Sequence, residues 1–208
     1  MKEIAFIASF FLTCFIANGQ DVSNTTYSEP PTIFQLTIND KVYPLCEGEN
    51  LRLDTTISKP TISIKTENYK QFNIQAISLR YPKNLSFQFE QDFGYKNWTL
   101  TGNTLTILIF EIDSKTELSE LLNNMVKKFG KKNCAIEDFQ KPLGHTMCNG
   151  KKLSVLIADQ HLVLDCYEIK LNDFKSRFIY FQDTLKDGKH SEEFENGFTL
   201  INSSFVVK

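Results

Sequence analysis

Two histidines lie close in sequence to groups with which they could do chemistry. His145 and Cys148 have the His-x-x-Cys spacing of a metal-ligand pair, and His161 lies four residues before Asp165. Residues four apart on a β-strand share one face, so His161 and Asp165 could meet one cation. A metal site wants three or four converging ligands, and surface polar residues on a hairpin are the commoner case. We therefore assign no metal ligand from these pairs.

The sequence lacks the short motifs that mark the commonest catalytic and cofactor sites. It contains no Gly-x-Ser-x-Gly, His-Glu-x-x-His, Walker loop or Gly-x-Gly-x-x-Gly. Spacing does not define a Ser-His-Asp triad, so a small secreted hydrolase or metal-dependent enzyme that uses His145 or His161 stays an alternative. The acidic group Glu192, Glu193 and Glu195 fits the first turn of a helix better than an acid–base pair. We assign no catalytic residue, expect no cofactor and favour a protein that is not an enzyme.

One aromatic cluster is a candidate binding surface. Phe93, Tyr95 and Trp98 surround Gly94, a residue typical of turns. Aromatic side chains in loops can provide the anchors of a contact surface for a protein or a sugar. The alternative is that these residues anchor the loop to the core. We take all three as speculative binding residues for an unknown protein or small-molecule ligand.

Four cysteines follow the N-terminal segment: Cys46, Cys134, Cys148 and Cys166. An even number in an exported chain suggests disulfides, with three possible connectivities. There is no Cys-x-x-Cys, so a thioredoxin-like or zinc-ribbon site lacks support. Cys134 and Cys148 are close in sequence and are the candidate disulfide pair, with buried thiols as the alternative.

The N-terminus has the pattern of a secretory signal peptide. Lys2 begins it, residues 4–16 are an apolar run, and Ala17-Asn18-Gly19 supplies small residues for cleavage. Residues 1–19 are therefore the predicted signal peptide, which makes the protein secreted or periplasmic. The polar residues 20–31 are a predicted flexible leader. No later stretch is long and apolar enough for a transmembrane helix.

Length and charge limit the possible partners. The chain has 208 residues and a net charge of −2, so no basic excess can hold a phosphate backbone, and nucleic acid is not an expected partner. Removing the signal peptide leaves about 189 residues, enough for one domain with its own core. We expect a single domain over residues 32–208.

The clearest structural pattern is a strand that leads into a helix. Residues 105–112 are apolar on both parities, which favours a strand covered on both faces. Ser114 is the predicted helix N-cap, with Glu117 as its capping-box partner. Residues 118–129 repeat apolar side chains at helical spacing, and Gly130 fits the C-cap. This apolar stripe predicts packed core rather than a ligand groove.

Shorter patterns complete the expected fold. Alternation over residues 32–38 and 41–46 predicts a β-hairpin, part of an N-terminal β extension over residues 32–66. Asn149-Gly150 is interpreted as a turn. Ser191 caps a predicted final helix that reaches Phe205. The order of many strands, one helix, further strands and one helix predicts an α+β fold, an antiparallel β-sheet covered by helices.

Residues 79–205 resemble the PsbP-like fold, named after an extrinsic subunit of photosystem II. The resembling features are Leu79-Arg80-Tyr81-Pro82, the apolar strand 105–110 before a long helix, Gly150-Lys151-Lys152-Leu153, the final strand with Gln182, and Ile201-Asn202-Ser203-Ser204-Phe205. The resemblance implies a PsbP-like core over residues 72–208. Members are mostly non-catalytic binders and adaptors without a shared active-site motif, so no functional residue is carried over.

These observations lead to three hypotheses. The first is an exported, non-catalytic binding or accessory protein, for example one that assists an envelope complex. The second is the secreted hydrolase or metal-dependent enzyme named above. The third is a structural surface component without a soluble ligand.

Overall fold

The structure, a computed structural model, describes residues 27–54 and 56–208. The predicted signal peptide and leader residues 20–26 lie outside this range. Strands dominate the described residues, and two α-helices accompany them. The predicted α+β class, with mostly antiparallel sheets, is confirmed.

A seven-stranded antiparallel sheet forms the centre of the molecule, in the order β6-β7-β8-β12-β11-β10-β9. Its strands are β6 (Ser86–Asp92), β7 (Tyr95–Thr101), β8 (Thr106–Ile112), β9 (Cys134–Leu143), β10 (Thr146–Ile157), β11 (Gln160–Ile169) and β12 (Ser176–Leu185). A small sheet contains β4 (Tyr69–Asn73), β5 (Ile77–Pro82) and β13 (Val206–Val207). The helices are α2 (Leu118–Phe129) and α3 (Glu192–Ser204), with a short 3-10 turn, η2 (Lys131–Asn133).

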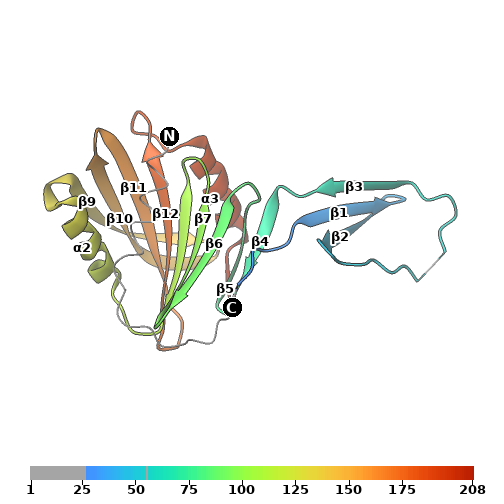
Figure 1. The fold of residues 1–208 in the computed structure, drawn as a ribbon, viewed down its shortest axis with the longest axis horizontal. Coiled ribbons are helices and arrows are strands. Elements are labelled where there is room, and N and C mark those ends of the chain that lie inside the picture. Colours follow the sequence, from blue (N-terminus) through green and yellow to red (C-terminus); the bar gives the residue numbers. More distant parts are fainter. Residues whose placement is uncertain (1–26, 55) are drawn as a thin grey trace.

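Both faces of the central sheet are covered, because successive side chains of a strand point to opposite sides. Ile109 of β8 and Ile179 of β12 lie in a core cluster with α3, β4 and β5. Leu108 and Phe178, one residue earlier on each strand, lie in a second cluster with α2. Figure 1 shows α2 and α3 on opposite sides of the sheet. The apolar pattern on both parities of residues 105–112 thus reflects burial on both faces.

The two helices differ in how their first turns are held. Ser191 caps α3 as predicted, because its side chain accepts a hydrogen bond from the N–H of Phe194 at 3.0 Å. The capping box predicted for α2 was wrong: α2 begins at Leu118 and has no side-chain cap. The residues before it are held by tertiary contacts instead, since the N–H of Thr116 donates to Ser176 Oγ at 2.8 Å.

The N-terminal sheet consists of β1 (Ile33–Ile38), β2 (Lys41–Cys46) and β3 (Ile62–Thr66), in the order β2-β1-β3. Asn39 and Asp40 both have positive φ, as the two central residues of a type I′ hairpin turn require. Figure 1 shows this sheet projecting from the rest of the molecule along its long axis. Only Ile38 among its apolar residues is buried.

The β9–β10 hairpin corrects one predicted turn. Asn149 and Gly150 lie inside β10, and the chain reverses at Gly144 and His145. Gly150 is needed for close packing rather than for a turn. A Cβ atom there would overlap the ring of Phe139 and lie 2.6 Å from the carbonyl oxygen of Cys166.

Replacing Gly150 with alanine is expected to lower the free energy of unfolding by about 1–3 kcal/mol, because the methyl group would displace Phe139 and crowd the neighbouring strand. Ser154→Ala, on the same face of β10, is the control and should change stability by less than about 0.5 kcal/mol. Urea unfolding measures both variants. Equal unfolding midpoints would contradict the close packing described here.

Candidate functional site

The structure separates the three aromatic residues that the sequence grouped. Phe93 lies in the β6–β7 turn with 82% of its surface exposed, whereas Trp98 is 1% exposed. Tyr95 is half-buried on β7. Trp98 packs against the rings of Phe72 and Phe89, with centroids 5.7 and 5.4 Å away, so it belongs to the core. The three residues therefore do not form one contact surface, and Phe93 alone is freely presented.

Part of the predicted flexible leader contacts this aromatic core. The ring centroid of Tyr27 lies 4.8 Å from that of Phe89 and 5.4 Å from that of Trp98. Glu29 Oε1 also accepts a hydrogen bond from Lys70 Nζ at 2.6 Å. The leader residues that the structure describes are thus anchored against β4, β6 and β7.

A second exposed phenylalanine lies at the same end of the sheet as Phe93. Phe174, in the β11–β12 loop, is 87% exposed. The two turns are joined through Asp113, whose N–H donates to the carbonyl of Gly94 at 2.8 Å and whose carboxylate lies 2.9 Å from Lys175 Nζ. We define the loop tip as residues 92–94, 113–117 and 170–175. Sequence reasoning missed Phe174, although its position between Asp173 and Lys175 marks an apolar residue in a polar loop.

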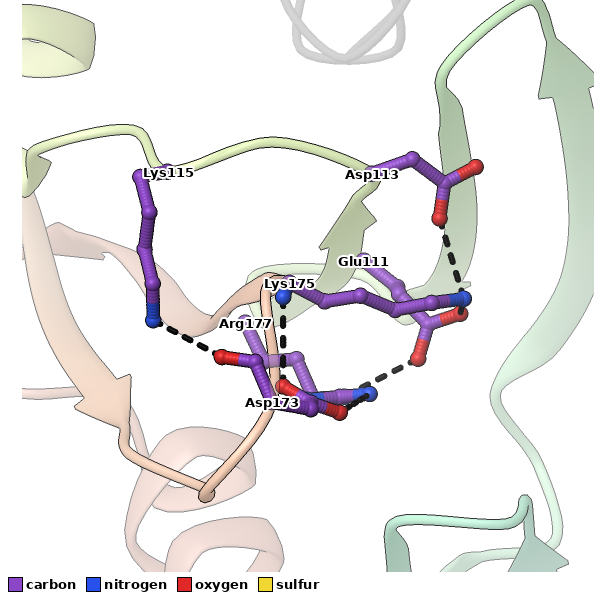
Figure 2. A network of polar contacts seen from close by, with 6 residues as sticks. All are labelled: Glu111, Asp113, Lys115, Asp173, Lys175 and Arg177. Carbon is purple, nitrogen blue, oxygen red and sulfur yellow. Dashed lines mark hydrogen bonds and ion pairs between the residues drawn. The ribbon is translucent and has the colours of Figure 1, made fainter.

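A charged network joins the segments of the loop tip (Figure 2). Glu111 and Arg177 are cross-strand partners on β8 and β12, and Arg177 Nε donates to Glu111 Oε2 at 2.9 Å. The two Nη atoms of Arg177 donate to the two carboxylate oxygens of Asp173 at 2.9 and 2.8 Å. Such a bidentate pair fixes the orientation of both groups. The β11–β12 loop is therefore held to the central strands.

Two lysines complete the network. Lys175 Nζ donates to Glu111 Oε1 at 2.8 Å and approaches Asp113, while Lys115 Nζ donates to the carbonyl oxygen of Asp173 at 2.9 Å. The hydrogen bond from Arg177 lowers the pKa of the Asp173 carboxyl, and the bond to Glu111 raises the pKa of Lys175. Three acidic and three basic groups thus balance one another, which favours a structural role over capture of a charged ligand.

The predicted histidine pairs do not assemble a site. His145 is exposed at the β9–β10 turn, whereas Cys148 is buried. His161 and Asp165 share a face of β11 but are four residue steps apart, roughly 13 Å, too far for one cation. Asp165 is instead 3.6 Å from Lys152 Nζ. Across residues 27–54 and 56–208, no three His, Cys, Asp or Glu side chains are grouped to hold a metal.

The histidine that does meet a carboxylate is one that sequence reasoning passed over. His190 Nδ1 lies 2.9 Å from Oδ2 of Asp183, whose side chain is fully buried at the end of β12. An aspartate that orients an imidazole in this way is part of many hydrolase sites. The available signal was Asp183 itself, a carboxylate at the end of a strand of apolar residues.

The groups around His190 serve the start of α3 rather than catalysis. The N–H of Ser191 also donates to Asp183 Oδ2 at 2.9 Å. The hydroxyl oxygen of Ser191 accepts hydrogen bonds from the N–H of Phe194 and from Thr104 Oγ1, the latter at 2.8 Å. A serine nucleophile would instead be hydrogen-bonded to the imidazole. The His190 ring stacks on Phe194, with ring centroids 4.0 Å apart. The described contacts of this pair therefore anchor a helix.

Glu193 also has a structural position, as expected for a helix-start cluster. Its carboxylate accepts hydrogen bonds from the N–H groups of Asn103, Thr104 and Leu105 at 3.2, 2.6 and 3.0 Å. It thereby ties α3 to the β7–β8 turn. Burial by itself raises the pKa of Glu193, but these donors together hold the pKa below its usual value.

The predicted Cys134–Cys148 disulfide was wrong, and all four described cysteines are free. Cys134 is opposite Val155 and Cys148 is opposite Lys141 in the β9–β10 hairpin. The two cysteines are thus separated by about seven residue steps, roughly 23 Å along the strands. They also lie on opposite faces, Cys148 in the α3-side core and Cys134 against the α2-side core.

Breaking the Glu111–Arg177 pair from one side should be more harmful than removing both charges. Arg177→Met is expected to lower the free energy of unfolding by about 1–3 kcal/mol, because Glu111 loses its buried partner and keeps only the half-exposed Lys175. Glu111→Gln combined with Arg177→Met should recover part of this loss. Chemical unfolding of both single variants and the double variant tests the coupling, and strictly additive effects would contradict it.

Glu193→Gln is expected to destabilise the protein by about 1–3 kcal/mol near neutral pH, because the charged acceptor of three N–H groups is lost. The folded-state pKa of Glu193 is lowered, so its contribution is present above the usual value and lost as pH falls through the lowered pKa. The difference between wild type and variant should therefore shrink in acid. Urea unfolding over a pH series measures it, with the exposed neighbour Glu192→Gln as control.

Comparisons with known proteins give limited results. No family model matches the chain, and no curated protein matches it. Its structure is similar to one from Bacteroides thetaiotaomicron VPI-5482, with 12% identity and a TM-score of 0.40, covering 68% of this chain and 49% of that chain. This chain thus spans about half the length of that protein. Within the described range, no helix combines the length and apolar character needed to cross a bilayer.

The chain is also similar to LpqN of Mycobacterium tuberculosis, described as involved in cell envelope biogenesis. The identity is 10% and the TM-score 0.40, and the match covers 67% of this chain and 90% of that chain. Likenesses at these scores carry no functional argument.

Proposed function

We propose that this is an exported, non-catalytic binding or accessory protein that docks on another protein through the loop tip. The observation that carries the proposal is the pair of exposed phenylalanines, Phe93 and Phe174, on turns connected through Asp113. Single exposed apolar residues are common, but two exposed phenylalanines on turns joined through one residue need an explanation.

Aromatic side chains on a rigid support are effective anchors. Burying a phenylalanine side chain contributes about 1.5–3 kcal/mol relative to leaving it exposed. The contacts of Asp173 and Lys175 with the central strands hold the residues on both sides of Phe174. Less conformational entropy is then lost on binding, since the loop is already ordered.

The charge of the loop tip favours a protein partner over an anionic membrane surface. The lysines Lys115 and Lys175 are each in contact with acidic residues or backbone of the same network, which is balanced in charge. Binding to anionic lipid relies on clusters of uncompensated basic residues. The partner surface that fits this tip is an apolar pocket with a mixed polar rim, as found in many protein interfaces.

The proposal includes the broader interpretation drawn from the sequence. The signal-peptide pattern of residues 1–19 supports export, and the resemblance of residues 79–205 to the PsbP-like fold supports an accessory role, for example in an envelope complex. In this view residues 32–66 are a β extension added to a PsbP-like core.

The test compares capture of proteins from the host's membrane and exported fractions by three baits. The double variant Phe93→Ser/Phe174→Ser removes both anchors and should weaken binding of a specific partner at least about tenfold, since truncation of an interface anchor commonly costs more than 1 kcal/mol. Met147→Ser removes an exposed apolar residue of β10, outside the loop tip, and is the control.

A partner retained by wild type and Met147→Ser but lost by the double variant supports the proposal. Unfolding curves should be close to wild type for both variants, because the replaced side chains are exposed. A partner that binds the double variant as tightly as wild type, or no specific partner at all, overturns the loop tip as the docking surface.

A further inference from the structure

We propose that two copies of this chain associate by antiparallel pairing of β3 with β3, forming a continuous six-stranded sheet around a two-fold axis at Ile64. The surface involved is the free edge of the N-terminal sheet, separate from the loop tip. The inference therefore does not depend on the function proposed above. Three features of β3 support this pairing: its outward-directed backbone groups, its exposed isoleucines, and the absence of like charges facing each other in the paired register.

The backbone of β3 has hydrogen-bonding groups directed away from the sheet. The N–H of Glu67 donates to the carbonyl of Ile33, and the N–H of Asn39 donates to that of Thr61. In an antiparallel pair, residues facing the partner alternate with residues facing outward. Given the β1–β3 register, the groups of Ile62, Ile64 and Thr66 point outward. No partner for them occurs among the residues that the structure describes.

The opposite edge of the same sheet is closed to strand addition. The register of β2 directs the backbone of Val42, Pro44 and Cys46 outward. Pro44 has no N–H to donate, and proline is typical of protected edges. The N–H of Cys46 is already bonded to Glu49 Oε2 at 2.7 Å, and its carbonyl accepts from the N–H of Glu49. The two edges therefore differ, and only β3 presents a regular row of free groups.

The side chains of β3 also lack an apolar cover. Ile62 and Ile64 are 60% and 66% exposed and share one face of the sheet with Phe34, Leu36 and Ile38 of β1. Apolar area of this kind contributes to stability only when it is removed from water. Pairing two such sheets edge to edge would double the apolar face and place the isoleucines at its centre.

The sequence of β3 is compatible with itself in this register. With Ile64 opposite Ile64 of the second copy, Ile62 is opposite Thr66 and Ser63 is opposite Lys65, so no like charges face each other. The C-terminal end of β3 leads directly to β4 and the main body (Figure 1). Antiparallel pairing therefore places the two bodies at opposite ends of the shared sheet. An isologous contact of this kind closes as a dimer.

The test is the molar mass of the purified mature chain in solution, measured by sedimentation equilibrium over a range of concentrations. Wild type is expected to be dimeric. Ile64→Lys should weaken dimerisation at least about a hundredfold, because two apolar side chains are lost from the centre and two like charges face each other there. Val42→Lys, an equally drastic change at the exposed β2 edge, is the matched control and should remain dimeric.

The register is tested separately in a Cys46→Ser/Cys134→Ser background with a short bis-maleimide reagent. Ile64→Cys should cross-link two copies efficiently, while Asp54→Cys, in the loop between β2 and β3, should not. A monomeric wild type at every soluble concentration overturns the proposal, including the case in which β3 pairs only with a different protein. A dimer that survives Ile64→Lys, or that is lost equally in Val42→Lys, also overturns it.

Discussion

The fold depends on the burial of the neighbouring strands β8 and β12 on both of their faces. Ile109 and Ile179 face one side of the sheet and Leu108 and Phe178 the other, so each face needs its own cover. The amphipathic helix α2 supplies one, and α3 with the small sheet of β4, β5 and β13 supplies the other. Because apolar area is buried on both sides, the central sheet provides a stable support for the loops at its ends.

The buried charged groups of this sheet, Glu111, Asp165, Arg177 and Asp183, each have an ionisable partner. At one end, Glu111 and Arg177 face each other and bind the loop that carries Asp173. At the other end, Asp183 accepts hydrogen bonds from the start of α3, since an unpaired buried carboxylate would be strongly destabilising. These polar groups hold strands, loops and the start of α3 together. Their hydrogen bonds therefore serve the fold rather than binding or catalysis. Large apolar side chains are nevertheless exposed at the loop tip and on the edge of β3.

Two surfaces of this kind differ in how they present apolar groups. The loop tip holds Phe93 and Phe174 on turns tied to the central sheet, which suits insertion of side chains into a pocket of another protein. The edge of β3 instead offers backbone groups together with Ile62 and Ile64, which suits addition of a strand. The proposed pairing of β3 would leave the loop tip free for the proposed partner.

Local patterns in the sequence were sufficient wherever a structure depends on neighbours along the chain. Helical spacing identified α2 and α3, and Ser191 was recognised as a cap. The same patterns misplaced the start of α2, because a contact from Ser176 outweighs the local capping box. The α+β class follows from the order of such elements and was therefore predictable.

Contacts between residues distant in sequence required the tertiary structure. Neighbouring aromatic residues separate into the core and the surface, because Trp98 alternates into a covered face while Phe93 lies in a turn. Cys134 and Cys148 are near in sequence but far apart along a hairpin in which ten residues of β9 pair with ten residues of β10. The sequence by itself determined the fold class and the approximate positions of the two helices. Only the packing of sheet against helix and the strand register decided which side chains meet, because both depend on residues brought together by folding.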